Sequence, residues 1–71
     1  MTIEELVSRF TYHAPKEDQV ERYEGIRAKG LLLALEVHGS CPESREKSLA
    51  MTKIEEAVMW ANAAIARNED D

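Results

Sequence analysis

The chain has 71 residues, a single cysteine and a formal net charge of −5. A domain this short buries a modest share of its surface and usually needs a metal, disulfides or a partner for stability. Cys41 has no second cysteine to pair with, and neither His13 nor His38 completes a zinc-binding spacing. Good helix packing or oligomerisation therefore remains as the source of stability. The acidic charge also disfavours long DNA or RNA, which bind to basic faces.

Hydropathy places the chain among folded proteins without a membrane span. Hydrophobic residues make up 44% of the sequence, which is ordinary for a folded domain. The longest apolar run, Leu31–Leu35, is far shorter than the roughly 20 residues of a spanning helix. The N-terminal residues lack the basic start and apolar run of a signal peptide. We therefore expect one cytoplasmic domain over residues 1–71, with no cofactor and with an acidic tail at residues 69–71.

A capping box predicts a short first helix over about residues 3–10. Thr2 is the expected N-cap, and Glu5 follows three residues later. The apolar face of this helix consists of Ile3, Leu6, Val7 and Phe10. Because two turns of helix are not stable alone, we expect this face to dock on another surface.

A second helix is predicted over about residues 19–38. Pro15 favours extended backbone before it, and Asp18 is the expected N-cap with Glu21 at the N3 position. Gly39 is placed to end this helix at the C′ position.

A third helix is predicted over about residues 42–68, with Ser40 or Cys41 as N-cap and Pro42 in its first turn. The connection to the second helix is only a few residues long, so the two long helices should lie antiparallel. The predicted fold class is therefore all-α. A short N-terminal helix precedes two long antiparallel helices that form a helical hairpin, and the hairpins associate into an oligomeric bundle.

Apolar stripes on the long helices predict association between copies. The third helix carries a coiled-coil-like seam and, beside it, a stripe of small residues spaced by seven. The seam consists of Met51, Ile54, Val58, Ala61 and Ile65, and the small residues are Ala50, Ala57 and Ala64. Leu31–Leu35 is apolar on all sides of the second helix, and such a segment is normally buried. Gly25 and Gly30 indicate either close approach by a backbone or ligand, or drift in a tolerant helix.

Enzyme signatures are absent from the sequence: there is no nucleophile elbow, P-loop, Gly-rich phosphate loop or HExxH motif. His38 and Cys41 are one nucleophile–base candidate. No third residue nearby orients them, so a loop thiol and a helix-terminal histidine are the favoured interpretation. We therefore predict that the protein is not an enzyme.

Several rings and cations are candidates for binding an anionic ligand. Tyr12 and His13 either stack on a nucleobase or belong to a connector whose Tyr12 covers the core. Arg22, Arg27 and Lys29 either contact phosphates or are solvated surface charges.

Trp60 and Arg67 lie seven residues apart and share a face of the third helix. Trp60 is expected in a core or an interface because of its size. Arg67 favours the dipole at the helix C-terminus, and in a symmetric oligomer it would converge with its copies on one anion.

Four segments resemble one family and together cover nearly the whole chain. They are residues 10–16, 19–27, 41–50 and 53–67, of which the last is the most specific. The family is the phage anti-CBASS sponge family (anti-CBASS protein two), which shares a hairpin domain with an anti-Thoeris sponge. The resemblance implies a compact homo-hexamer of helical hairpins. Such a protein sequesters the cyclic oligonucleotide signals of bacterial immunity, such as cyclic GMP-AMP, without cleaving them, in the cytoplasm of the infected host.

The resemblance also implies roles for individual residues. Tyr12 would stack on a base of a cyclic dinucleotide in a pocket between two protomers, and Arg27 or Lys29 would meet its phosphates or base edges. The candidates for a cyclic trinucleotide, held where three protomers meet, are Arg67, Asn62 and Thr11.

Two further hypotheses remain beside the sponge. A helical hairpin with a second apolar face also fits a small interaction module that binds a host or phage protein. An enzyme that uses Cys41 and His38 is the third.

Overall fold

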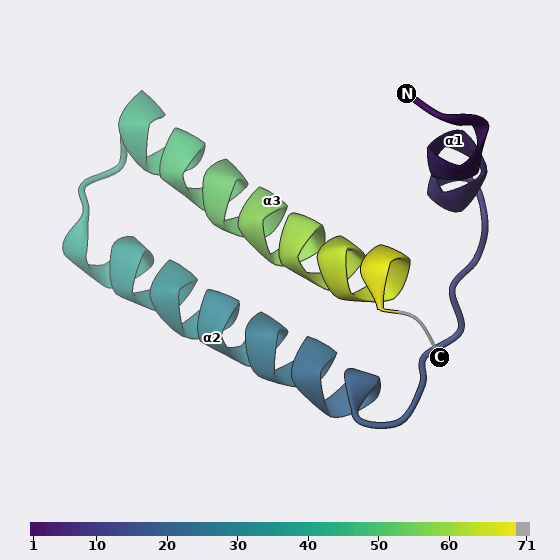
Figure 1. Cartoon of the computed structure of the whole chain (residues 1–71). Coiled ribbons are helices and arrows are strands. Elements are labelled where there is room, and N and C mark those ends of the chain that lie inside the picture. Colours follow the sequence, from purple (N-terminus) through teal and green to yellow (C-terminus); the bar gives the residue numbers. More distant parts are fainter. Residues whose placement is uncertain (70–71) are drawn as a thin grey trace.

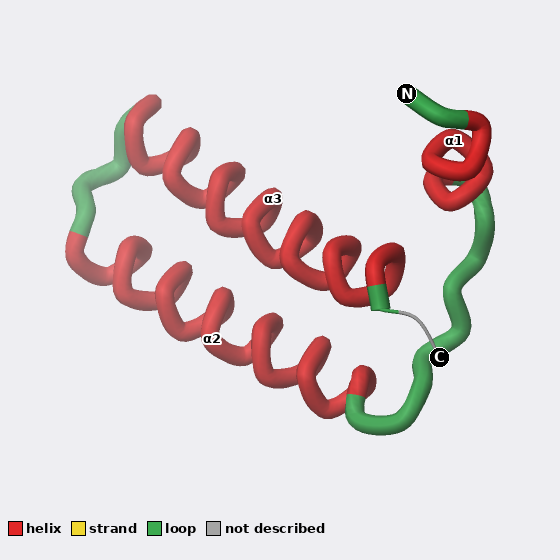
Figure 2. The backbone as a smooth tube through the Cα atoms, in the orientation of Figure 1, coloured by secondary structure: helices red, strands yellow, loops and turns green. Residues whose placement is uncertain are grey.

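The computed structural model describes residues 1–69, which form three helices (Figure 1, Figure 2). Their bounds are Ile3–Arg9 for α1, Gln19–Ser40 for α2 and Arg45–Asn68 for α3. The two long helices lie side by side and antiparallel, and α1 stands apart beyond the end of α3. The predicted all-α helical hairpin is therefore confirmed. Residues 70 and 71 of the predicted acidic tail lie outside the described residues.

The first helix begins as its capping signal predicts, but its apolar face is not covered. Thr2 Oγ1 accepts a hydrogen bond from the Glu5 N–H at 3.0 Å. Ile3 and Phe10 are nevertheless 75% and 86% exposed, and Leu6 and Val7 are exposed as well. Within residues 1–69, the expected docking of this face does not occur. The connection between α1 and α2 alone holds the short helix near the hairpin.

The predicted capping box at the start of α2 does not form. Asp18 is the N-cap residue, but its backbone is not extended, so its side chain caps no N–H of the first turn. The carboxylate instead pairs with Arg22 at 3.2 Å, one turn along the helix. The first turn is anchored by the backbone, where the Gln19 N–H donates to the Lys16 carbonyl at 2.8 Å.

The turn between the long helices also differs from the prediction. The second helix continues through Gly39 to Ser40, so Gly39 is not a C′ residue and has no positive φ. The third helix begins at Arg45, and its N-cap is Ser44, whose Oγ accepts from the Lys47 N–H at 3.1 Å. Pro42 explains both shifts, since it disfavours helical geometry at the residue before it. Cys41 is therefore extended and ends α2, and the next capping side chain with a free N–H beyond it is Ser44.

The hairpin is closed by the predicted seam on α3. All five seam residues, Met51 through Ile65, are half-buried, as are Gly30, Ala34 and Val37 opposite them on α2. Gly30 is explained by close packing, because a Cβ at this position would lie 2.4 Å from Val58 Cγ2. Gly25 has no such neighbour: a Cβ there would have nothing within 4 Å. Of the two interpretations, close approach thus holds at Gly30 but not at Gly25.

The hairpin is a single layer of helices without a buried core. Its principal extents are 44 × 28 × 13 Å, and the smallest equals about one helix diameter. Its radius of gyration is 15.2 Å, against about 11 Å for a compact domain of this length. No apolar side chain of residues 1–69 is buried. The predicted burial of Leu31–Leu35 does not occur in this single chain, where its four leucines are 53–66% exposed, because α3 covers only one side of α2.

Candidate functional site

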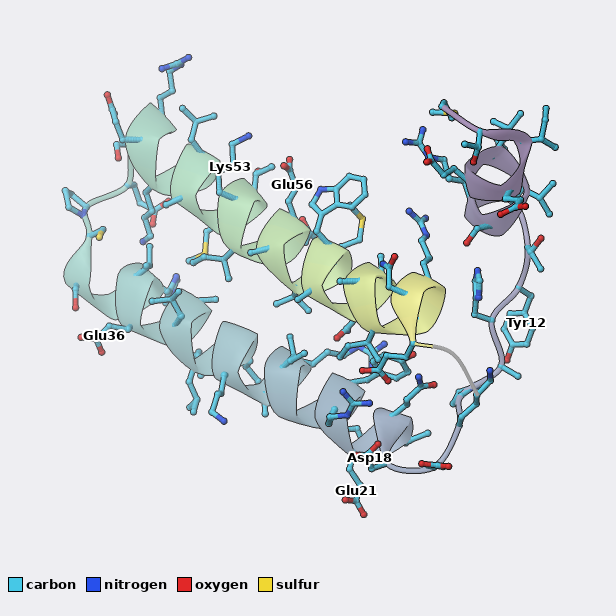
Figure 3. The ribbon with its side chains drawn as sticks, in the orientation of Figure 1. Tyr12, Asp18, Glu21, Glu36, Lys53 and Glu56 are labelled. Atoms are coloured by element: carbon cyan, nitrogen blue, oxygen red, sulfur yellow. The ribbon has the colours of Figure 1, made fainter. Side chains whose placement is uncertain are left out.

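The linker between α1 and α2 folds back on the end of α1. His13 Nε2 lies 2.9 Å from the Ser8 carbonyl oxygen, and because a carbonyl only accepts, Nε2–H is the donor. The Thr11 hydroxyl donates to the Val7 carbonyl at 2.6 Å. These two bonds hold residues 8–13 in a tight return, which brings Arg9 and the linker rings to the open end of the hairpin. Figure 3 shows Tyr12 on this linker.

A hollow of about 340 Å³ lies at the open end, where the linker meets both long helices. We call it the open-end pocket. Each of the three segments contributes part of its wall. The lining residues are Arg9, Thr11, Tyr12 and His13 from the N-terminal segment, Tyr23 and Arg27 from α2, and Asn62, Ala63, Ala66 and Arg67 from α3. The two alanines leave the space that the longer side chains surround.

The open-end pocket is strongly cationic in an acidic protein. Three arginines line it, and no aspartate or glutamate does. Within residues 1–69, no carboxylate lies within salt-bridge distance of Arg9, Arg27 or Arg67. Each other hollow described below contains at least one glutamate. Three guanidinium groups without counter-ions, held close together, form a site for an anion with more than one negative charge.

Groups suited to a nucleobase lie beside these cations. Tyr12 is 83% exposed, so its ring is open to stacking, and Tyr23 is half-buried in the same wall. The Asn62 side-chain oxygen is buried and has no hydrogen-bond partner. A buried amide oxygen without a donor is costly, and an N–H on the edge of a base would satisfy it. The exposure of Tyr12 also excludes the interpretation that it covers a core.

A polar cluster closes the hairpin next to the pocket. Arg22 donates to both carboxylate oxygens of Glu69, at 2.7 and 2.5 Å, and Gln19 Nε2–H donates to Glu69 Oε1 at 2.9 Å. The Arg22 bonds, followed by the bond from Gln19, lower the pKa of Glu69 to about 2. The same partner raises the pKa of Arg22 above its usual range. Arg22 is therefore neutralised within the chain and is not one of the free cations of the pocket.

The structure brings five of the six predicted binding residues to this one pocket: Tyr12 and Arg27 of the dinucleotide set, and Thr11, Asn62 and Arg67 of the trinucleotide set. The resemblance had divided them between two sites. Lys29 is exposed on α2 and does not line the pocket. Trp60, expected in a core or an interface, is 57% exposed on α3. Cys41 is exposed at the end of α2, and His38 there contributes its carbonyl oxygen to Lys47.

Sequence reasoning missed two residues of the pocket, Arg9 and Tyr23. Tyr23 lies four residues before Arg27, and this spacing places both on one face of a helix, so their partnership was visible in the sequence. Arg9 had no such signal. It reaches the pocket only because the return of residues 8–13 carries the end of α1 toward α3.

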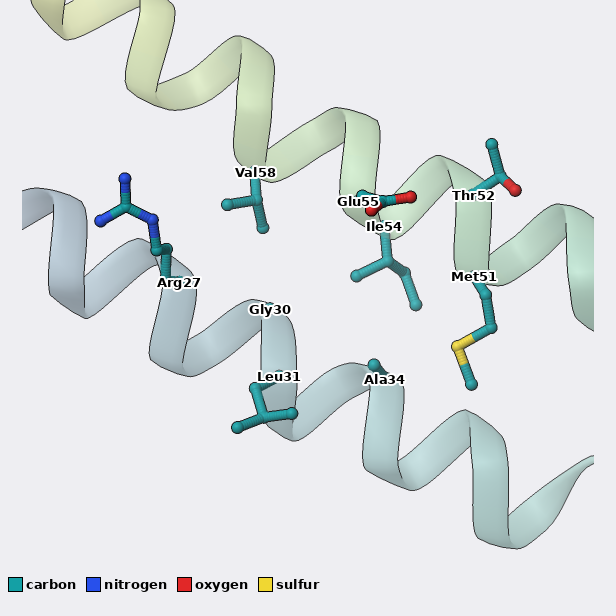
Figure 4. A pocket seen from close by; sticks show the side chains of 9 residues that line it. All are labelled: Arg27, Gly30, Leu31, Ala34, Met51, Thr52, Ile54, Glu55 and Val58. Carbon is teal, nitrogen blue, oxygen red and sulfur yellow. The ribbon is translucent and has the colours of Figure 1, made fainter.

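A second hollow lies between the middles of α2 and α3 and is mostly apolar (Figure 4). We call it the mid-hairpin groove. It has a volume of about 440 Å³, and its walls are Arg27, Gly30, Leu31 and Ala34 from α2 and Met51, Thr52, Ile54, Glu55 and Val58 from α3. Two further hollows at the open end contain carboxylates, Glu4 and Glu5 in one and Glu69 in the other.

Two other kinds of site were sought among residues 1–69. No group of three His, Cys, Asp or Glu side chains there is close enough to hold a metal ion. None of the helices in this part of the chain has the length and apolar character needed to cross a bilayer.

The fold and the pocket define a class: a small helical hairpin with a cationic, ring-bearing pocket at its open end. Comparison with family models gives a match to the model described as Acb2/Tad1, hairpin domain, over residues 2–66. The chain therefore belongs to the Acb2/Tad1 hairpin-domain family, and the resemblance to the anti-CBASS family is confirmed. Comparisons with curated proteins and with solved structures gave no match.

Proposed function

We propose that this chain is a non-catalytic sponge for cyclic di- and trinucleotide immune signals, such as cyclic GMP-AMP. By sequestering the signal in the cytoplasm of an infected bacterium, it would let a phage evade CBASS defence. Membership of the Acb2/Tad1 hairpin-domain family supports this role. The observation that carries the proposal is the convergence of three arginines without counter-ions, two tyrosines and an unpartnered amide oxygen on one pocket.

The chemistry of a cyclic dinucleotide matches these groups. Its two phosphates carry two negative charges, which guanidinium groups bind through paired charge-assisted hydrogen bonds. Its bases offer flat faces to Tyr12 and donor N–H groups to Asn62. Long nucleic acid would be repelled by the net charge of −5, whereas a small cyclic molecule meets only the cationic pocket.

The size of the pocket favours a site completed by other copies of the chain. Ligand sites enclose roughly 300–1,000 Å³, and a hollow of about 340 Å³ is at the low end of that range for a ligand with two nucleotides. The exposed leucines of α2, the exposed face of α1 and Trp60 supply apolar surface for assembly. We therefore include a homo-hexamer in the proposal, with Lys29 supplied to the pocket by a neighbouring protomer.

The proposal is tested by titration calorimetry with a panel of cyclic di- and trinucleotides, on the wild-type chain and on Tyr12→Ala. We expect wild-type binding with one preferred ligand, and at least tenfold weaker binding by Tyr12→Ala, because stacking on one base contributes about 1–3 kcal/mol. Heating the complex and removing the protein should return the ligand intact. Linear products in the supernatant would identify a nuclease, and no binding to any member of the panel would overturn the proposal.

The exposed apolar surface also fits the alternative, a module that binds a host or phage protein. Light scattering separates the two hypotheses without a ligand. A mass of six chains supports the sponge assembly, whereas a monomer or dimer that binds no cyclic nucleotide supports the interaction module.

A further inference from the structure

The most buried side chain of residues 1–69 is a polar one. Gln19, the first residue of α2, is only 4% exposed, while no apolar side chain of this part of the chain is buried. Burying an amide is costly unless its hydrogen-bonding groups find partners. A buried glutamine in a protein without a buried apolar core therefore indicates a specific structural task.

Gln19 joins three segments through the two ends of its amide. Its Oε1 accepts the main-chain N–H of Lys16 at 2.9 Å, and its Nε2–H donates to Glu69 Oε1 at 2.9 Å. The side chain thus connects the linker, the start of α2 and the residue that follows α3. Arg22 holds the same Glu69 carboxylate from α2, so the acceptor is fixed in position.

These bonds lie directly beside the candidate site. A hollow next to the open-end pocket is lined by Gln19 and Glu69 together with Tyr12, His13 and Arg67, and the last three also line the open-end pocket. The linker carries Tyr12 only four residues before the Lys16 N–H that Gln19 holds. Within residues 1–69, α1 makes no extensive packing contact with the hairpin, so the position of the linker depends on such individual bonds.

We propose that Gln19 is a positioning residue for the open-end pocket: by holding the Lys16 main chain against Glu69, it fixes the linker that presents Tyr12 and His13 to the ligand. This inference rests on the proposed binding of cyclic nucleotides. It adds to it a residue that touches no ligand but sets the geometry of one wall of the site.

Two substitutions separate the two bonds of Gln19. Gln19→Lys keeps a donor for Glu69 but removes the acceptor for the Lys16 N–H. Gln19→Glu keeps that acceptor but places a carboxylate against Glu69, and the repulsion opens the contact. If Gln19 acted only by closing the hairpin through Glu69, Gln19→Lys would be silent.

We expect Gln19→Lys to bind cyclic GMP-AMP about tenfold more weakly, which is 1.4 kcal/mol, with an unfolding temperature close to that of the wild type. Amide hydrogen exchange should show faster exchange at Lys16 in this variant. Gln19→Glu should lose affinity together with stability. Glu21→Gln is the matched control: it lies two residues away, points away from the hairpin in Figure 3, and should bind as the wild type does.

Each result decides the inference. Unchanged affinity in Gln19→Lys, with faster exchange at Lys16, overturns the positioning role. Unchanged exchange at Lys16 overturns it as well. If the wild-type chain binds no cyclic nucleotide, the proposed function fails on its own, while the exchange measurement still decides whether Gln19 fixes the linker.

Discussion

The open-end pocket and the mid-hairpin groove lie between the same two helices, yet their chemistry differs. The groove is walled mainly by Leu31, Ala34, Met51, Ile54 and Val58, and Glu55 stands at its edge. The pocket has three arginines, two tyrosines and no carboxylate. Arg27 borders both.

The difference follows from what each hollow borders. In the middle of the hairpin, the two helices face only each other, so their seam supplies apolar walls. At the open end a third segment, the linker, adds polar side chains that no helix needs for packing. The comparison teaches that this chain separates the two tasks: the seam provides stability, and the end of the hairpin provides recognition.

The largest expected effect comes from removing the free cations of the open-end pocket. A hydrogen bond to a charged group contributes about 1.5–3 kcal/mol, so Arg27→Gln and Arg67→Gln should each weaken cyclic GMP-AMP binding by about 10- to 100-fold. Calorimetry measures the dissociation constants. Arg45→Gln, at the exposed start of α3, is the matched control and should retain full affinity. An equal loss in all three variants would mean that general charge, not the pocket, governs binding.

A smaller effect is expected from filling the tightest contact of the mid-hairpin groove. The Cβ of Gly30→Ala would lie 2.4 Å from Val58 Cγ2, and valine is stiff about χ1 in a helix. We expect the free energy of unfolding to fall by about 1–3 kcal/mol, as measured by circular dichroism during thermal unfolding.

Two variants sharpen this test of the groove. Gly25→Ala meets nothing within 4 Å and should raise stability by about 1 kcal/mol, through helix propensity alone. Adding Val58→Ala to Gly30→Ala should relieve the clash. If Gly30→Ala and Gly25→Ala behaved alike, close approach would not be the reason for glycine at position 30.

The smallest effect is the pH dependence of the cluster beside the open-end pocket. Hydrogen bonds from Arg22 and Gln19 lower the pKa of Glu69 from 4.5 to about 2. Because the folded chain binds this proton less readily than the unfolded one, the cluster stabilises the fold fully above about pH 4.5, and the contribution disappears as the pH falls through about 2. A carboxyl-carbon NMR titration should report the lowered pKa.

Arg22→Gln provides the control for this titration. Without the guanidinium group, the pKa of Glu69 should rise toward its ordinary value, since the largest cause of the shift is removed. A Glu69 that titrates normally in the wild-type chain would contradict the contact between Arg22 and Glu69.

Local signals in the sequence predicted much of the fold, and their failures have physical causes. Thr2 caps α1 as expected, since its partner lies three residues away. Asp18 does not cap α2, because Arg22 competes for its carboxylate. At the turn, the effect of Pro42 on the preceding residue outweighed the tendency of Gly39 to end a helix.

The sequence by itself determined three helices, an antiparallel hairpin, the seam from Met51 to Ile65 and several rings and cations of the candidate site. Periodicity and short-range spacing carry that information. Only the tertiary structure decided that Arg9, Arg27 and Arg67 meet without a counter-ion, while Arg22 is neutralised by Glu69. These residues are far apart in the chain, so their distances depend on how the linker returns and on where α3 ends. No local pattern encodes those two facts.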